Sequence, residues 1–92
     1  MGIIRIEKIP NAGFKFDSGK MIYAVKVTSR FLFIYSQACY YPTNQAITNN
    51  DGTIKYILFV DKFGADIPEK LSKQLYSWDI INSDDSKEEE NL

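Results

Sequence analysis

The chain has 92 residues, of which 45% are hydrophobic, 14% aromatic and 25% charged, and its formal net charge is −1. A chain of this length holds a single hydrophobic core, because it buries only roughly 60 to 65% of its unfolded surface. The composition excludes wholesale disorder. No apolar run is longer than that of residues 31–35, which is far shorter than the roughly 18 residues that span a bilayer. We therefore expect one small domain that is not an integral membrane protein.

Charge is distributed unevenly along the chain. Residues 1–82 carry ten Lys or Arg and seven Asp or Glu, whereas residues 83–92 carry one Lys and five acidic residues. We predict one β-rich domain over 1–82 and a flexible acidic tail over 83–92, because the tail has almost nothing to bury. The N-terminus has no basic region followed by a long apolar stretch, so the expected location is cytoplasmic, in the cell or in an infected host cell.

Two further features of composition bear on origin and compartment. The only cysteine, Cys39, has no partner for an internal disulfide, which fits a reducing compartment, and we predict that it is a small buried hydrophobe. The nine lysines against two arginines, with many Ile, Asn and Tyr, are the usage that an AT-rich coding sequence produces. This usage favours a low-GC bacterium or a phage as the source.

The first third of the sequence predicts three strands joined by turns. Residues 3–9 alternate imperfectly between apolar and polar and stop at the turn sequence Pro-Asn-Ala-Gly of residues 10–13. Residues 14–16 alternate cleanly, and a second turn at 17–20 leads to a strand over 21–28. The last two segments are expected to pair as antiparallel strands.

The middle of the sequence predicts a central strand and a hairpin. Residues 31–41 open with five apolar residues, so we expect this segment to anchor the core and to end at Pro42. Asp51-Gly52 is a strong hairpin signal, since both residues tolerate positive φ angles. Residues 53–61 are the predicted returning strand.

One helix is predicted after the strands. Asp66 is a good N-cap, Glu69 completes a capping box, and Pro68 is tolerated in the first turn. Four apolar residues at helical spacing form one stripe that should lie across a face of the sheet: Ile67, Leu71, Leu75 and Trp78. The predicted fold is α+β, a four- to five-stranded antiparallel, meander-like sheet followed by one C-terminal amphipathic helix.

The chain contains no histidine, which removes the commonest general base near neutral pH and every Ser-His or Cys-His pair. One cysteine cannot form a structural zinc site, and no glycine-rich phosphate loop is present. Pairs of carboxylates can also catalyse reactions, but Asp17, Asp51 and Asp66 have structural explanations as turn or cap residues. We predict that the protein is not an enzyme and uses no cofactor.

Two functions remain open. The first is a non-catalytic protein-binding module or homodimer that regulates or inhibits a larger macromolecule, as small phage accessory proteins do. The aromatic surplus, and an apolar strand that one helix would not fully cover, favour it. The predicted partner-binding residues are Phe33, Tyr35, Tyr40 and Tyr41.

The alternative is a single-stranded nucleic-acid-binding protein whose acidic tail competes with the ligand for a basic face of the sheet. The predicted nucleic-acid contacts are Arg5, Lys15, Lys26 and Lys55. Strand alternation places the lysines opposite the aromatic residues of the same strands, so a solvated basic face is favoured over a binding face.

Overall fold

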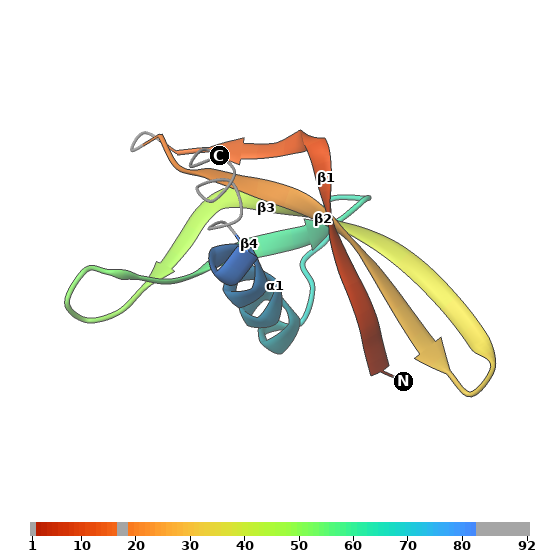
Figure 1. Ribbon diagram of the computed structural model, residues 1–92. Coiled ribbons are helices and arrows are strands. Elements are labelled where there is room, and N and C mark those ends of the chain that lie inside the picture. The colour runs from red at the N-terminus through yellow and green to blue at the C-terminus, as the bar shows by residue number, and fades with distance from the viewer. Residues whose placement is uncertain (1, 17–18, 83–92) are drawn as a thin grey trace.

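The computed structural model describes residues 2–16 and 19–82, which form a four-stranded antiparallel sheet followed by one helix (Figure 1). The strands lie in chain order across the sheet: β1 (Gly2–Lys15), β2 (Met21–Phe31), β3 (Ile34–Thr48) and β4 (Ile54–Asp61), and the helix α1 covers Glu69–Asn82. The predicted α+β class, the antiparallel meander and the C-terminal helix are confirmed. The predicted acidic tail, residues 83–92, lies outside the described residues. Over the part of the chain that is described, no helix has both the length and the apolar character to cross a bilayer.

β1 is one continuous strand, so the predicted turn at residues 10–13 is wrong. Ile9 pairs with Ala24 and Gly13 pairs with Tyr23, which leaves three residues of β1 without a partner on β2. The proline of this segment is accommodated because β1 is an edge strand and a bulge needs no ladder hydrogen bond from it. The bulge bends β1, as Figure 1 shows, and the sheet has four strands because the two predicted N-terminal strands are one.

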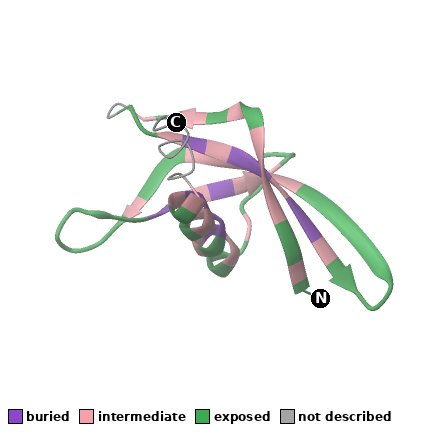
Figure 2. Cartoon of the chain, in the orientation of Figure 1, coloured by how far each residue is buried: buried purple, intermediate pink, exposed green. Residues whose placement is uncertain are grey.

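The core lies where the sheet meets α1 and centres on β2 and β4 (Figure 2). Ala24 and Val25 are adjacent on β2 and both fully buried, so β2 is covered on both faces. β2 therefore has the central role that the sequence pattern assigned to residues 31–41. The buried apolar cluster consists of Ile22, Val25, Val27, Ile57, Phe59 and Leu75.

β3 begins later and ends later than the sequence predicts, so the expectation of a core strand over residues 31–41 is wrong. Phe31 pairs with Ile34, and the two residues between them form the turn of the β2–β3 hairpin. β3 then continues through Pro42 to residue 48. Pairing of β3 with β2 ends at Tyr40, so the missing N–H of Pro42 removes no hydrogen bond to β2.

The hairpin predicted at Asp51-Gly52 is confirmed. Gly52 has a φ of 90°, and its N–H donates to the carbonyl of Asn49 at 3.0 Å. The Asp51 carboxylate accepts hydrogen bonds from the Thr53 hydroxyl at 2.6 Å and from the Thr53 N–H at 3.0 Å. These hydrogen bonds lower the pKa of Asp51 and fix the turn that joins β3 to β4.

The predicted N-cap of the helix is wrong, although the helix itself and its apolar stripe are confirmed. α1 begins at Glu69, and the carbonyl of Pro68 accepts hydrogen bonds from the N–H groups of residues 71 and 72. Asp66 instead forms an isolated bridge with Val60. Glu69 forms an ion pair with Lys73 at 2.9 Å. The stripe packs on the core through Ile67, Leu71, Leu75 and Trp78.

A buried serine joins α1 to the free edge of the sheet. Ser72 is fully buried, and its hydroxyl accepts a hydrogen bond of 3.1 Å from the N–H of Phe59. This N–H points away from β3, toward the edge of β4 that no strand covers. Without this contact, the N–H of Phe59 would be a buried donor with no hydrogen-bond partner.

A buried carboxylate lies near the end of α1. Asp79 is 1% exposed, and neither of its oxygens accepts a hydrogen bond of ordinary geometry from a described residue. Burial raises the pKa of Asp79, while the backbone of Tyr23 and the ammonium groups of Lys8 and Lys20 act in the opposite direction. The carboxyl group therefore holds its proton more tightly in the folded chain than a solvated aspartate does.

Candidate functional site

The β2–β3 hairpin extends away from α1 as an arm whose end carries five consecutive apolar residues (Figures 1 and 2). β1 runs beside the arm only as far as Gly2, which pairs with Arg30. All five residues, 31–35, are exposed, and Phe33 is 94% and Leu32 71% accessible to solvent. We call residues 31–35 the apolar tip. No apolar run of the chain is longer, and this one lies outside the core.

The turn at the apolar tip holds a leucine in a backbone conformation that favours glycine. Leu32 has a φ of 57°, and every other positive φ in the described part of the chain belongs to a glycine. Two-residue hairpin turns commonly place glycine, asparagine or aspartate at such positions, and an L-residue with a side chain is disfavoured there by roughly 1–2 kcal/mol. Leu32 is thus unfavourable in both backbone conformation and exposure.

Arginines accompany the apolar tip along the arm. Arg30 pairs with Tyr35 at the base of the tip. Arg5, one strand away on β1, lies 3.7 Å from the carboxylate of Glu7. A surface that combines clustered apolar and aromatic side chains with arginine has the composition of protein interfaces.

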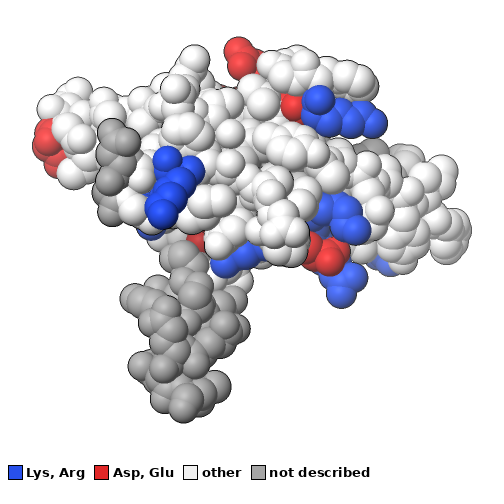
Figure 3. Space-filling model, turned by 90° about the horizontal axis from the view of Figure 1, so that it is seen from above, with Lys and Arg blue, Asp and Glu red and all other residues white. Residues whose placement is uncertain are grey.

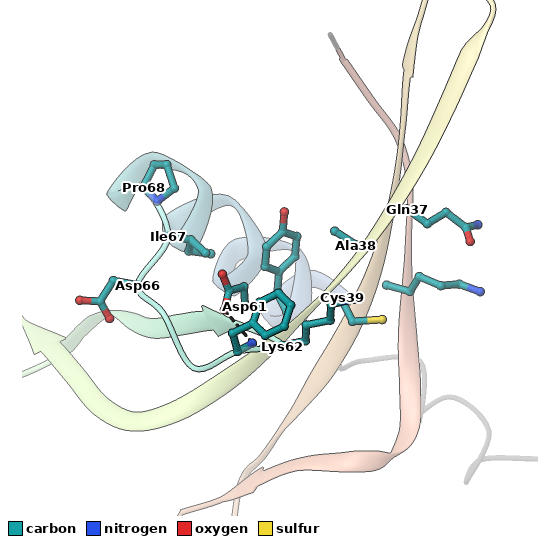
Figure 4. Close-up of a pocket in the computed structure, with 11 residues that line it drawn as sticks. Gln37, Ala38, Cys39, Asp61, Lys62, Asp66, Ile67 and Pro68 are labelled. Atoms are coloured by element: carbon teal, nitrogen blue, oxygen red, sulfur yellow. Dashed lines mark hydrogen bonds between the residues drawn. The ribbon is translucent and has the colours of Figure 1, made fainter.

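A groove lies on β3 next to the base of the arm (Figure 4). Its volume is about 640 Å³. Ala38 and Ile67 point toward each other across it in Figure 4. Its apolar lining comes from β3 on one side and from the connection between β4 and α1 on the other: Ala38, Tyr40, Phe63, Ile67 and Pro68. We call it the β3 groove.

The connection that forms the far wall of the β3 groove is held by one carboxylate. Asp61 accepts hydrogen bonds from the N–H groups of Phe63 at 2.8 Å and Ala65 at 3.0 Å. The N–H of Asp61 donates to the carbonyl of Ala65 at 3.0 Å. These contacts fix the backbone of residues 61–65, so the wall is set by the chain itself and leaves Phe63 82% exposed.

The structure divides the four predicted partner-binding residues into two pairs. Phe33 and Tyr35 are exposed and belong to the apolar tip. Tyr40 is half-buried, packs against the core and lines the β3 groove, and Tyr41 is half-buried opposite Val60. The sequence pattern assigns the remaining tip residues to a core strand. The sequence contains no turn signal that would separate these residues from that strand.

The four basic residues predicted to contact nucleic acid do not come together. Arg5 and Lys15 pair with positions of β2 that are seven residues apart, which is roughly 23 Å along a strand. Lys55 lies at the start of β4, and Lys26 borders the β3 groove. On the face seen in Figure 3, basic side chains are separated by uncharged surface, and some lie beside acidic ones.

The described residues offer little for metal or thiol chemistry. Within residues 2–16 and 19–82, no group of three His, Cys, Asp or Glu side chains is placed to hold a metal ion. Cys39 is half-buried and borders the β3 groove, so the prediction that it is a buried hydrophobe is wrong. The apolar tip and the β3 groove are the surfaces on which a function can be argued.

Comparison with known proteins gives no match: no protein-family model fits the chain, no curated protein is similar to it, and no solved structure shares its fold at a significant level.

Proposed function

We propose that the protein is a non-catalytic binding protein that acts through protein–protein contact at the apolar tip, as a small accessory regulator or inhibitor of a larger macromolecule. The exposure of five consecutive apolar side chains, residues 31–35, carries this proposal. Transfer of one such side chain from water into an apolar site is worth roughly 1.5–3 kcal/mol. Binding energy in protein interfaces is commonly concentrated in a few aromatic and arginine side chains of this kind.

The construction of the arm supports the proposal. β2 and β3 remain paired up to Phe31 and Ile34, so the backbone is internally hydrogen-bonded almost to the turn. On the arm, the Gln37 amide donates to the Thr28 hydroxyl at 3.3 Å across the two strands. A hairpin that is already paired loses little conformational entropy when it enters a cavity of a partner.

Site-specific photo-cross-linking tests the proposal. Phe33 is replaced by benzoylphenylalanine, and the chain is irradiated in the cells in which it is naturally made. The matched control carries the same group at Ile81, which is also exposed, at 71%, but lies on α1. We expect a discrete protein adduct from position 33 and none from position 81.

Competition shows whether that adduct is specific. Excess unmodified chain should suppress the adduct, whereas a chain with Leu32→Ser and Phe33→Ser should not. Circular dichroism and thermal unfolding confirm that this double variant is folded. Equal labelling from positions 33 and 81, or suppression by both competitors alike, would overturn the proposal.

A further inference from the structure

We propose that residues 34–38 of β3 form a free backbone edge on the arm, to which the partner protein adds an extended segment as a further strand of the sheet. We call these residues the free edge. The inference deepens the proposed function and rests on it for a protein partner, because the free edge begins within the apolar tip. Pairing along the edge engages backbone groups, so the side chains of the turn, Leu32 and Phe33, remain available to the same partner.

The arm contains three strands, whereas the sheet beside α1 contains four (Figure 1). β3 pairs with β2 from Ile34 to Tyr40, but its pairing with β4 starts only at Tyr40, opposite Asp61. Beyond that point the chain turns back, since the N–H of Asp61 donates to the carbonyl of Ala65 at 3.0 Å. Within the described part of the chain, no strand therefore lies on the outer side of residues 34–38, and all five are exposed.

The backbone groups of two residues point outward from the free edge. Phe31 and Ile34 close a two-residue turn, so they form a hydrogen-bonded pair of the β2–β3 ladder. Backbone groups of successive residues point alternately to the two sides of a strand. The N–H and C=O of Tyr35 and Gln37 consequently point away from β2, and no residue that the structure describes pairs with them. An extended peptide presents donors and acceptors at the matching interval, which identifies the class of ligand.

The free edge lacks the features that protect the other edge of the sheet. Exposed edges in natural proteins commonly carry charged residues, proline or a bulge, which prevent pairing with another chain. β1 forms the opposite edge, and it has charged residues at positions 5, 7 and 8, followed by a bulge that contains Pro10. Residues 34–38 contain no charged residue and no proline. Pairing with another chain is therefore hindered at β1 and permitted at β3.

The β3 groove lies at the end of the free edge, because Gln37 and Ala38 line it. Side chains alternate along an added strand as they do along β3, so those on the Ala38 face enter the space between Ala38 and Ile67 (Figure 4). A volume of about 640 Å³ accepts a large apolar side chain there. The charged residues of the lining are two lysines and two aspartates, so the groove has no net charge that would select a charged segment. We expect the added segment to be uncharged where it pairs and to carry an apolar side chain at the groove.

Photo-cross-linking at the groove tests strand addition. Phe63, which is 82% exposed and lines the β3 groove, is replaced by benzoylphenylalanine, and the chain is irradiated in the cells in which it is naturally made. This chain also carries either Gln37→Pro, which removes an outward N–H, or Gln37→Ala, which keeps it. Both changes remove the hydrogen bond from the Gln37 amide to Thr28, so their comparison isolates the backbone group.

Without a change at Gln37, we expect position 63 to label the same protein as position 33. Gln37→Pro should reduce this adduct by about tenfold or more, whereas Gln37→Ala should leave it within about twofold. Circular dichroism and thermal unfolding show whether each variant is folded.

Amide hydrogen exchange of the unmodified chain tests the free edge without a partner. The amide hydrogens of Tyr35 and Gln37 should exchange faster than those of Ser36 and Ala38, which donate to β2. Equal protection of all four in dilute solution would overturn the free edge. This measurement keeps the inference falsifiable even if Gln37→Pro fails to fold.

The outcomes separate this inference from the proposed function. An adduct from position 33 without one from position 63, or a position-63 adduct that both Gln37 variants form equally, overturns strand addition and leaves the proposed function standing. An adduct from position 63 alone, lost with Gln37→Pro, supports the free edge and overturns the role of the tip. An adduct of twice the 10.6 kDa chain mass would make a second copy the occupant and overturn the inference of a different partner. Absence of an adduct from both positions overturns both.

Discussion

The N–H of Phe59 and the side chain of Ser72 form a buried hydrogen bond that ties α1 to the outer edge of β4. β3 pairs with one edge of β4, whereas the other edge is covered by the isolated bridge between Val60 and Asp66 and by α1. The helix therefore acts on β4 as a fifth strand would, through one side chain instead of a ladder. Ser72 therefore adds a directional contact to the apolar packing that holds α1 on the sheet.

Removing the Ser72 hydroxyl should destabilise the fold. Ser72→Ala leaves the Phe59 N–H buried and unpaired, and we expect the free energy of unfolding to fall by about 1–3 kcal/mol. The control is Ser77→Ala, an exposed serine of the same helix, for which we expect a change within about 0.5 kcal/mol. Urea unfolding of both variants measures the difference, and equal stabilities would contradict the structural role of the hydrogen bond.

The buried carboxyl of Asp79 should make stability depend on pH. Its pKa is raised in the folded chain, so on raising the pH the unfolded chain ionises first. The free energy of unfolding then falls as the pH rises above the ordinary carboxyl value of 3.8 and through the raised value. Asp79→Asn removes this titration, so the stability of the variant relative to the unmodified chain should increase from about pH 4 to pH 7. Unfolding curves at a series of pH values test this, and a constant difference would contradict it.

The backbone of the turn at the apolar tip should accept glycine better than a β-branched residue. Leu32→Gly relieves the positive φ, and this gain roughly offsets the larger entropy of glycine in the unfolded chain, so we expect a change within about 1 kcal/mol. Leu32→Val places a β-branched residue at the same φ and should lower stability by about 1 kcal/mol or more. Thermal unfolding of the two variants compares them. A less stable glycine than valine variant would show that the leucine is not strained.

Gly13 should tolerate no side chain. A Cβ there would collide with the carbonyl oxygen of Ile22 and come within 3.0 Å of the Tyr23 Cα. We expect Gly13→Ala to lower the free energy of unfolding by about 1–3 kcal/mol, because the bulge of β1 must shift. Gly2→Ala is the control, since nothing lies within 4 Å of its added carbon. Chemical unfolding gives both values, and an unchanged Gly13 variant would mean that β1 adjusts freely.

Single-stranded nucleic acid should bind weakly if at all, because the structure spreads the basic residues apart. We expect no saturable change in the fluorescence anisotropy of a labelled single-stranded oligonucleotide at low salt. Saturable binding that weakens with salt would instead support the nucleic-acid alternative. Loss of that binding in Arg5→Ala or Lys26→Ala, which lie near the arm, would identify the surface involved.

Local signals in the sequence were sufficient for the order of the strands and for the helix. Asp51-Gly52 marks its turn because positive φ angles are tolerated there, and the apolar stripe of α1 repeats at helical spacing. Pro10 and Pro42 led to wrong predictions of where strands end. A proline ends a strand only where the N–H that it lacks would be needed for a hydrogen bond of the sheet. Pro10 lies at a bulge in an edge strand, and Pro42 lies beyond the last pairing of β3 with β2.

The candidate site could be predicted only in part. Five apolar residues in succession have the same pattern in a buried strand and at the end of a hairpin, so the pattern cannot locate residues 31–35. The turn Leu32-Phe33 also lacks the Gly, Asn or Asp that marks most hairpins. Phe33 and Tyr35 were nevertheless identified as partner-binding candidates, because a single helix cannot cover every apolar face of this sheet. The β3 groove has no sequence signal, since its walls come from segments more than twenty residues apart.

The ammonium group of Lys8 donates a hydrogen bond of 3.3 Å to the carbonyl of Asn82, which joins residues 74 positions apart. Each strand pair, by contrast, connects neighbours in the chain, so the sheet can form through a succession of short loop closures. Contact between β1 and the end of α1 closes a loop of nearly the whole described chain. Its cost in loop-closure entropy is therefore larger than that of any hairpin in the sheet. The folding rate should therefore be governed by the hairpins, and the last turn of α1 should exchange its amide hydrogens before the central strands do.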